Sequence, residues 1–371
     1  MKVLALASYP VEAAATRYRL EQFVAPLAER GISLTVHPFL DSMLFEQLYR
    51  REKLTGTAIR LAASALLRFK EVWSARRADV VLIQREAMMF GPPLIEWLVT
   101  RVSKCPMVLD LDDATYVSYT SPTYGTLGQK LKWFSKTDDL IAWSSIVTCG
   151  NRSIADYVTS KGADARVIPT VVDTDLFQPA ERRKEGPLVL GWVGTHSTFP
   201  YLEAIFPTLQ RLAGQHEIKL KIVGSGRKGV NLAGVNVENL EWSLEREIAD
   251  FQSFDIGLYP IDAHLYSTKW AAGKSGFKAI QYMAVGIPYV ATPVGAVAEI
   301  GTAGVTHLHA VSNEEWFEAL ESLVVNREQR EKMGVAGRRH VCECYSLAAQ
   351  AKKLAEAIRE AAAKGKSSTK A

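Results

Sequence analysis

Short apolar segments alternate with longer amphipathic segments along most of the chain, and this alternation limits the fold more than any other feature. In the first half the strand-like segments are 2–8, 33–39, 79–84, 106–112, 144–150 and 165–172. Segments with a helical pattern separate them, at 16–30, 57–77, 92–103, 128–142 and 151–161. Strands separated by helices need crossover connections, which make neighbouring strands parallel. The pattern therefore predicts an α/β protein with a doubly wound parallel sheet.

The same alternation starts again after a charged segment, "QPAERRKEGP" at 178–187, which has the composition of a linker. The strand-like segments of the second half are 188–194, 218–224, 235–242, 254–260, 288–295 and 305–310. A chain of 371 residues is also longer than one hydrophobic core usually serves. We therefore predict three parts, an N-terminal domain (1–180), a C-terminal domain (181–345) and a C-terminal helix with a frayed tail (346–371).

Charge, hydropathy and cysteine content exclude several classes of protein. The 44 basic and 40 acidic residues give a net charge of +4, which is too small to indicate a nucleic-acid partner. No run of about 18 apolar residues is present, and the opening "MKVLALASYP" turns polar too soon for a signal sequence. We expect a cytoplasmic protein. Its four cysteines (Cys105, Cys149, Cys342 and Cys344) lack the spacing of a zinc site, so we expect reduced thiols and no metal.

The segment 50–77 holds eight bases and two acids, a local basic excess. It also has a helical stripe of apolar residues, Ile59, Ala62, Leu66, Phe69 and Trp73. Two interpretations are open. The segment is a crossover helix buried on its own sheet with a solvated basic face, or it docks on an anionic membrane surface.

The segment "GKSGFKAIQYMAVGIP" at 273–288 predicts an anion site at the start of a helix that stops at Gly286. Free N–H groups and the positive end of the helix dipole attract anions there. The phosphate-binding candidates in this segment are Lys274, Ser275, Gly276 and Lys278. The alternative is that both lysines are ordinary solvated helix residues.

Around this segment, "KSGFKAIQYMAVGIPYVATPVG" resembles the nucleotide-sugar-binding part of GT-B glycosyltransferases of the retaining group called family 4. "VIPTVVDTDLFQP" from Val167, "KIVGSGR" from Lys221 and "FQSFDIGLYP" from Phe251 match the same family in the same order. The likeness covers the C-terminal half, whereas "TRYR" and the α/β alternation support it in the N-terminal half. It implies two Rossmann-like domains facing each other across a cleft, with the C-terminal helix returning to the N-terminal domain.

The resemblance also implies roles for residues of the C-terminal half. The family's ribose-binding acid falls on Gln281, and its sugar-facing acid falls on Gly273. An amide at 281 can still hydrogen-bond a ribose hydroxyl. The donor phosphates are expected near Gly194 and Thr195, and the base in the loop of Glu241 and Trp242. His196 is a candidate catalytic or donor-binding residue; alternatively it is polar surface, and Trp242 is core packing.

Polar residues also follow strands of the N-terminal half, at the edge where open α/β sheets bind ligands. In "VLDLDDATY" the candidates are Asp110, Asp112 and Asp113, with Asp112 and Asp113 as catalytic residues. We weigh three interpretations: an acceptor-side polar cluster, a metal-binding D-x-D, and a helix N-cap cluster. Arg17, Arg19 and Arg85 are candidates for the acceptor side, unless they form surface ion pairs.

The resemblance implies a metal-independent enzyme without a cofactor. It would move a sugar from a nucleoside-diphosphate sugar to a glycan or lipid-linked acceptor, with retention, in the cytoplasm or peripherally on the inner face of the membrane. Loss of both acids of the family motif keeps two alternatives open, a catalytically silent sugar-nucleotide-binding subunit and a nucleotide-sugar epimerase of GT-B fold. The sugar, the base, the acceptor and the oligomeric state cannot be read from the sequence.

Overall fold

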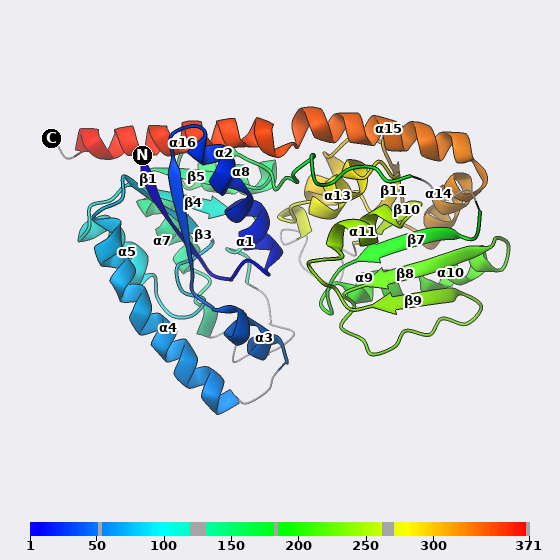
Figure 1. The fold of residues 1–371 in the computed structure, drawn as a ribbon, viewed down its shortest axis with the longest axis horizontal. Coiled ribbons are helices and arrows are strands. Elements are labelled where there is room, and N and C mark those ends of the chain that lie inside the picture. The colour runs from blue at the N-terminus through cyan, green and yellow to red at the C-terminus, as the bar shows by residue number, and fades with distance from the viewer. Residues whose placement is uncertain (51–53, 119–130, 182–184, 262–270, 369–371) are drawn as a thin grey trace. The chain divides into compact units, whose positions relative to one another are not determined.

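The computed structural model describes residues 1–50, 54–118, 131–181, 185–261 and 271–368. Their contacts divide the chain into two compact units. Unit 1 comprises Met1–Val171 together with Leu347–Ala371, and unit 2 comprises Val172–Ser346. The chain enters unit 2 once and returns to unit 1 for its last helix (Figure 1).

Unit 1 is built on a six-stranded parallel sheet with the order β2-β1-β3-β4-β5-β6. Its strands are β1 (Lys2–Ala7), β2 (Ser33–Pro38), β3 (Val80–Gln84), β4 (Met107–Leu111), β5 (Ile146–Cys149) and β6 (Ala165–Val167). All residues of β3, β4 and β5 are buried, as expected of strands covered on both faces. This confirms the predicted α/β class.

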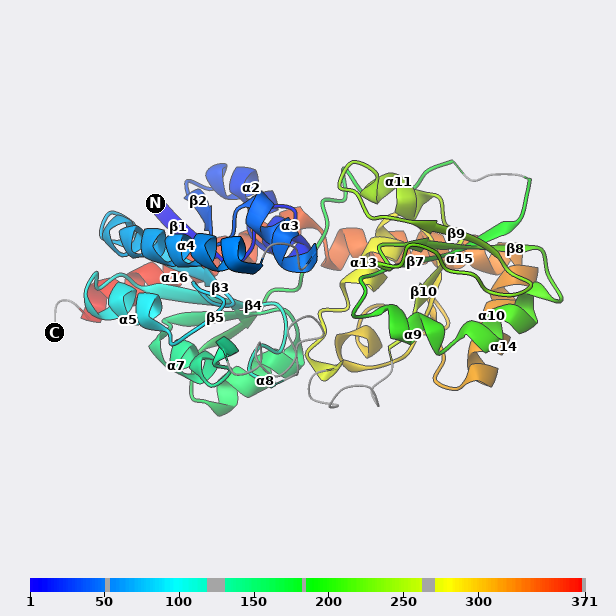
Figure 2. The same cartoon turned by 90° about the horizontal axis from the view of Figure 1, so that it is seen from below.

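Helices lie on both sides of this sheet (Figure 2). They are α1 (Ala14–Arg19), the 3₁₀ turn η1 (Glu21–Phe23), α2 (Val24–Ala28), α3 (Ser42–Arg50), α4 (Leu54–Ala75), α5 (Leu94–Arg101), α7 (Lys136–Trp143), α8 (Arg152–Ser160) and α16 (Leu347–Ser368). The helix predicted over 16–30 is broken at Leu20. Pro26 contributes to the irregularity, because it has no N–H to donate to a preceding turn. The first part of the helix predicted at 128–142 lies outside the described residues.

Helix α4 is the crossover between β2 and β3, but its apolar stripe does not cover the sheet. The side chains that α4 buries belong to Thr57, Arg68, Val72 and Ala75. Ile59, Leu66 and Trp73 are instead 73%, 72% and 64% exposed. The crossover interpretation is therefore right about the place of the helix and wrong about the face that it buries. Arg68 reaches inward to donate to the carbonyl oxygens of Ala7, His37 and Ala87. Arg51 and Lys53 lie outside the described residues.

Helix α16 packs on unit 1, where it contacts α2, β3, β4 and β5. The side chains that it buries include the predicted apolar stripe, Leu347, Ala351, Leu354 and Ile358. Polar contacts flank the stripe: Arg166 pairs with Glu360 at 2.9 Å, and Lys364 pairs with Asp164 at 2.6 Å. The last helix thus supplies part of the hydrophobic covering of the first sheet.

Unit 2 has a second six-stranded parallel sheet with the order β12-β11-β10-β7-β8-β9. Its strands are β7 (Leu188–Val193), β8 (Ile218–Val223), β9 (Asn236–Leu240), β10 (Ile256–Tyr259), β11 (Tyr289–Ala291) and β12 (Leu308–His309). Its helices are α9 (Phe199–Glu203), α10 (Phe206–Ala213), α11 (Glu247–Gln252), α13 (Phe277–Ala284), the 3₁₀ turn η2 (Gly295–Ala298), α14 (Asn313–Val325) and α15 (Arg327–Cys344). One face of the sheet forms a core with α9, α10 and α14.

The contacts divide the chain at 171/172 and 346/347, whereas the sequence predicts boundaries at 180/181 and 345/346. The segment before 180 belongs to unit 2 because Arg338 of α15 donates to the carbonyl oxygens of Thr174 and Phe177. Within the described residues, no helix is both long enough and apolar enough to span a bilayer.

Candidate functional site

In unit 2, the loops that follow β7 and β8 approach each other through glycines. A Cβ at Gly224, whose φ is +80°, would lie 2.5 Å from the carbonyl oxygen of Gly194. A Cβ at Gly226 would lie 2.9 Å from the Cβ of His196. Thr195 and His196 are exposed at this carboxyl edge of the sheet. The predicted donor-side residues Gly194, Thr195 and His196 thus lie in one loop, held close to the loop after β8.

The start of α13 has the backbone geometry that the sequence indicates. Gly276 is the N-cap and has a φ of 66°, in the left-handed region that favours glycine. A Cβ there would come within 2.3 Å of Ile300, so the position excludes larger residues. Lys274 and Ser275 precede the cap and are partly exposed, as is Lys278 in the first turn. The structure therefore brings the four phosphate-binding candidates together at one helix N-terminus.

Gln281, the predicted ribose-binding residue, is completely buried. Its Nε2 donates to Oε1 of Glu247 at 3.4 Å, and its Oε1 accepts from Nζ of Lys278 at 3.1 Å. Glu247 is the first residue of α11 and is itself 4% exposed. A contact between Gln281 and a ribose stays a prediction, and in this structure the amide is already engaged on both sides.

The predicted base-binding loop lies between β9 and α11. Glu241 is exposed and Trp242 is partly buried. Arg246 donates to the carbonyl oxygen of Glu241, which ties the loop to the start of α11. The Cβ of Trp242 lies 3.3 Å from the position of a Cβ at Gly224, so this loop also adjoins the loop after β8.

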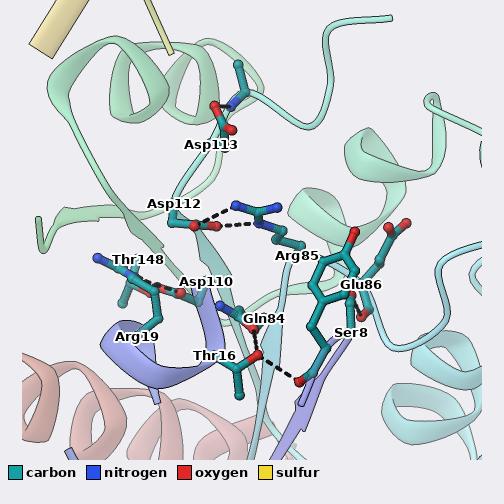
Figure 3. A network of polar contacts seen from close by, with 12 residues as sticks. Ser8, Thr16, Arg19, Gln84, Arg85, Glu86, Asp110, Asp112, Asp113 and Thr148 are labelled. Atoms are coloured by element: carbon teal, nitrogen blue, oxygen red, sulfur yellow. Dashed lines mark hydrogen bonds and ion pairs between the residues drawn. The ribbon is translucent and has the colours of Figure 1, made fainter. Parts of the chain in front are cut away.

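In unit 1, Arg85 and Asp112 form a paired charge cluster after β3 and β4 (Figure 3). Nε and one terminal nitrogen of Arg85 donate to the two carboxylate oxygens of Asp112, at 2.6 and 2.7 Å. Burial alone would raise the pKa of Asp112, but the adjacent Arg85 outweighs burial and lowers it. Arg85 has a φ of 61°, which is unusual for a residue with a side chain and typical of functional positions.

A second pair, Arg19 and Asp110, lies deeper in unit 1. Arg19 donates to both carboxylate oxygens of Asp110 and to the carbonyl oxygen of Ile168. Thr148 of the neighbouring strand donates to Asp110 at 2.6 Å. Arg19 is 4% exposed and Asp110 is 3% exposed. Arg19 therefore forms a buried ion pair, in contrast to the surface ion pair that was the alternative to an acceptor-side role. A role of Arg19 on the acceptor side stays a prediction.

These contacts bear on the D-x-D interpretation. The oxygens of Asp110 accept from Arg19 and Thr148, and those of Asp112 accept from Arg85. Among the described residues, no group of three or more histidine, cysteine, aspartate or glutamate side chains is arranged to hold a metal ion. Asp113 accepts from the N–H of Ala114, a local turn contact. The pairing with arginines favours the polar-cluster interpretation over a metal site.

Two further features of this edge were not predicted from the sequence. Glu86 pairs with Lys136 at 2.7 Å and accepts, through its carbonyl oxygen, from Ser8 at 2.9 Å. Thr16 donates to the carbonyl oxygen of Tyr9 at 2.8 Å. The polar run Gln84, Arg85 and Glu86, which begins at the last residue of the buried strand β3, is the signal that would have pointed to Glu86. Arg17 lies nearby in sequence and donates to the carbonyl oxygens of Val11 and Glu12.

Solved structures with the same architecture are found at low sequence identity. A glycosyltransferase from Rickettsia africae ESF-5 aligns with a TM-score of 0.68 and 14% identity, over 97% of this chain and 98% of that one. Anabaena Alr3699/HepE in complex with UDP-glucose aligns with a TM-score of 0.68 and 14% identity, over 97% and 99%. Sucrose-phosphate synthase from Thermosynechococcus elongatus aligns with a TM-score of 0.67 and 14% identity, over 97% and 98%. No curated protein matches the sequence significantly.

Two parallel α/β units with these structural relatives define the GT-B class of fold, which confirms the predicted fold class. Residues 188–326 match the family described as Glycosyl transferases group 1. The matched segment contains the loop of His196, the loop of Trp242 and the start of α13.

Proposed function

We propose that the chain transfers a sugar from a nucleoside-diphosphate sugar to a glycan or lipid-linked acceptor, with retention and without a metal ion. The observation that carries the proposal is the start of α13 inside the glycosyltransferase domain. There a left-handed glycine cap and two lysines stand at the positive end of a helix dipole, which suits a diphosphate. When a nucleoside diphosphate leaves an anomeric carbon, negative charge grows on the phosphate oxygens, and cations already in place stabilise it.

The acceptor side in this proposal is the Arg85–Asp112 pair of unit 1. Arg85 can bind an anionic or hydroxyl group of the acceptor, while Asp112 holds its guanidinium in place. The lowered pKa of Asp112 keeps its carboxylate charged at neutral pH. Because the carboxylates of Asp110 and Asp112 are already paired, the proposal needs no metal ion at this edge.

An epimerase is the second candidate. A putative UDP-N-acetylglucosamine 2-epimerase from Listeria monocytogenes aligns with a TM-score of 0.56 and 13% identity, over 95% of this chain and 94% of that one. The two candidates differ in their need for an acceptor. A transferase releases nucleoside diphosphate only when an acceptor is present, whereas an epimerase changes the nucleotide sugar by itself.

Replacing Lys274 by Ala is expected to weaken binding of UDP by about 1.5–3 kcal/mol, the range for hydrogen bonds to charged groups. Isothermal titration calorimetry on the full chain measures this directly. The control is Lys332→Ala, because Lys332 lies on α15 with 75% of its side chain exposed and pairs with Glu328 one helical turn away. Equal affinities for wild type, Lys274→Ala and the control would show that Lys274 is an ordinary solvated residue that does not bind the nucleotide.

We further propose that the exposed face of α4 docks on an anionic bilayer, where a lipid-linked acceptor would lie. This face carries Ile59, Leu66, Leu67, Phe69 and Trp73, all at least 41% exposed. Lys70 is exposed on α4, and Arg76 and Arg77 are exposed in the turn directly after it. The acid Glu71 instead contacts His37, with Oε1 of Glu71 2.8 Å from Nδ1 of His37. Apolar side chains bordered by bases suit insertion at an anionic lipid surface.

Replacing Leu66 and Trp73 together by Ser is expected to reduce binding to vesicles at least about tenfold, because each large apolar side chain contributes about 1.5–3 kcal/mol when buried. Sedimentation with vesicles of phosphatidylcholine and phosphatidylglycerol measures the bound fraction. Val335→Ser is the control, since Val335 is 72% exposed on α15. Wild-type binding that is absent, or that is unaffected by the double substitution, would contradict the docking proposal.

A further inference from the structure

Helices α11 and α13 of unit 2 are joined by an aromatic contact and a polar contact. The rings of Phe251 and Tyr282 meet edge to face, with centroids 5.3 Å apart. Nζ of Lys278 lies 5.5 Å from the centre of the Phe251 ring, so the lysine side chain leans from α13 toward α11. Glu247 stands one helical turn before Phe251. The acid, the amide Gln281 and the ammonium of Lys278 therefore gather between the first turns of the two helices.

The amide between the acid and the base has one satisfactory orientation. Gln281 donates through Nε2 to Glu247 and accepts through Oε1 from Lys278. The reverse orientation would set an oxygen against a carboxylate and an NH₂ against an ammonium. A glutamate at 281 could accept from Lys278, but its second oxygen would face the carboxylate of Glu247. An amide is thus the side chain of this length that suits both neighbours.

We infer that residue 281 is an amide because it links Glu247 to Lys278, and that Glu247 is a positioning residue which holds the ammonium of Lys278 beside the start of α13. This inference rests on the proposed function for its consequence, a cation held ready for the donor phosphates. The three side chains together carry no net charge. Burial strengthens both contacts, since Gln281 is 0% and Glu247 is 4% exposed.

The decisive comparison uses Gln281→Glu and the exchange variant Glu247→Gln/Gln281→Glu. In the single variant two buried carboxylates face each other across one lysine, and one of them must take up a proton. Its folded-state pKa is then raised, so stability is retained at low pH and lost as the pH rises through that pKa. The exchange variant keeps one acid, one amide and one base, with the acid directly beside Lys278.

We expect Gln281→Glu to bind UDP at least tenfold more weakly than wild type at pH 8, and to recover most of this loss at pH 5.5. The exchange variant should bind UDP within threefold of wild type at both pH values. Urea unfolding gives the free energy of unfolding of each variant. For Gln281→Glu this free energy should be lower than that of wild type at pH 8, and the difference should be smaller at pH 5.5. For the exchange variant it should match that of wild type at both pH values. Gln210→Glu is the control for added charge, since Gln210 lies on α10 and donates to Ala233.

Two results would overturn the inference. One is tighter UDP binding by Gln281→Glu, which would favour direct contact between residue 281 and the ribose. The other is an exchange variant as impaired as the single variant, which would show that the order of acid and amide is irrelevant. If wild type binds no UDP, the donor carries another base, and the unfolding comparison still decides whether residue 281 bridges an acid and a base.

Discussion

A chain that ends at Tyr345 is expected to lose the cooperative unfolding transition of unit 1. Truncation removes α16, whose buried apolar side chains include Leu347, Leu354 and Ile358. Each of these contributes about 1.5–3 kcal/mol when buried, so their loss approaches the whole stability of an ordinary domain, about 5–15 kcal/mol. The ion pairs of Glu360 and Lys364 to unit 1 are lost as well.

Differential scanning calorimetry of the truncated chain measures this loss. The transition of unit 2 should persist, because α2, β3, β4 and β5, the elements that α16 chiefly contacts, belong to unit 1. A chain that ends at Ser367 keeps these buried residues and serves as the control. A truncated chain in which unit 1 unfolds at an unchanged temperature would show that α16 is not part of its core.

Replacing Arg19 by Met is expected to destabilise unit 1 by about 3–5 kcal/mol, because it leaves the carboxylate of Asp110 buried without its counter-charge. Arg19 and Asp110 have side chains only 2% and 4% exposed. The carbonyl oxygen of Ile168 also loses its donor. Urea unfolding followed by circular dichroism gives the change in the free energy of unfolding.

The matched control for Arg19 is Arg60→Met, which removes an ion pair between Arg60 and Asp41 whose side chains are 37% and 58% exposed. Exposed pairs contribute about 0–1 kcal/mol, so this variant should remain near wild type. The double variant Arg19→Met/Asp110→Asn should be less destabilised than the sum of its single variants, since it leaves no unpaired buried charge. Additive effects would mean that the two side chains do not act as a pair.

The sequence predicts the sheets well because buried parallel strands leave a strong local pattern. The strands β3, β4 and β5 are buried along their whole length, and each appears as a short run of apolar residues. The start of α13 is also a local feature, since a glycine cap and neighbouring lysines stand within six residues. The fold and the phosphate-binding candidates could therefore be found without long-range information.

Partners that are distant in sequence could not be found in this way. Arg19 and Asp110 are 91 residues apart, and Glu247 and Gln281 are 34 residues apart. Nothing in the local pattern of either partner identifies the other. The sequence could not decide which face of α4 is buried, for a related reason. Its apolar stripe has the period of a buried helix, and only tertiary packing decides which face meets the sheet. The same stripe thus supported two opposite interpretations.

The central claim is acceptor-dependent transfer from a nucleoside-diphosphate sugar, and it is tested most directly by incubating the full chain with a panel of labelled nucleotide sugars. Each donor is assayed with and without a membrane and glycan extract as acceptor, in the presence of EDTA. The account predicts that one donor releases nucleoside diphosphate only with the acceptor extract, and that EDTA leaves the rate unchanged. Conversion of the free nucleotide sugar without acceptor would indicate an epimerase, and binding without any turnover would indicate a silent subunit; either result would contradict the account.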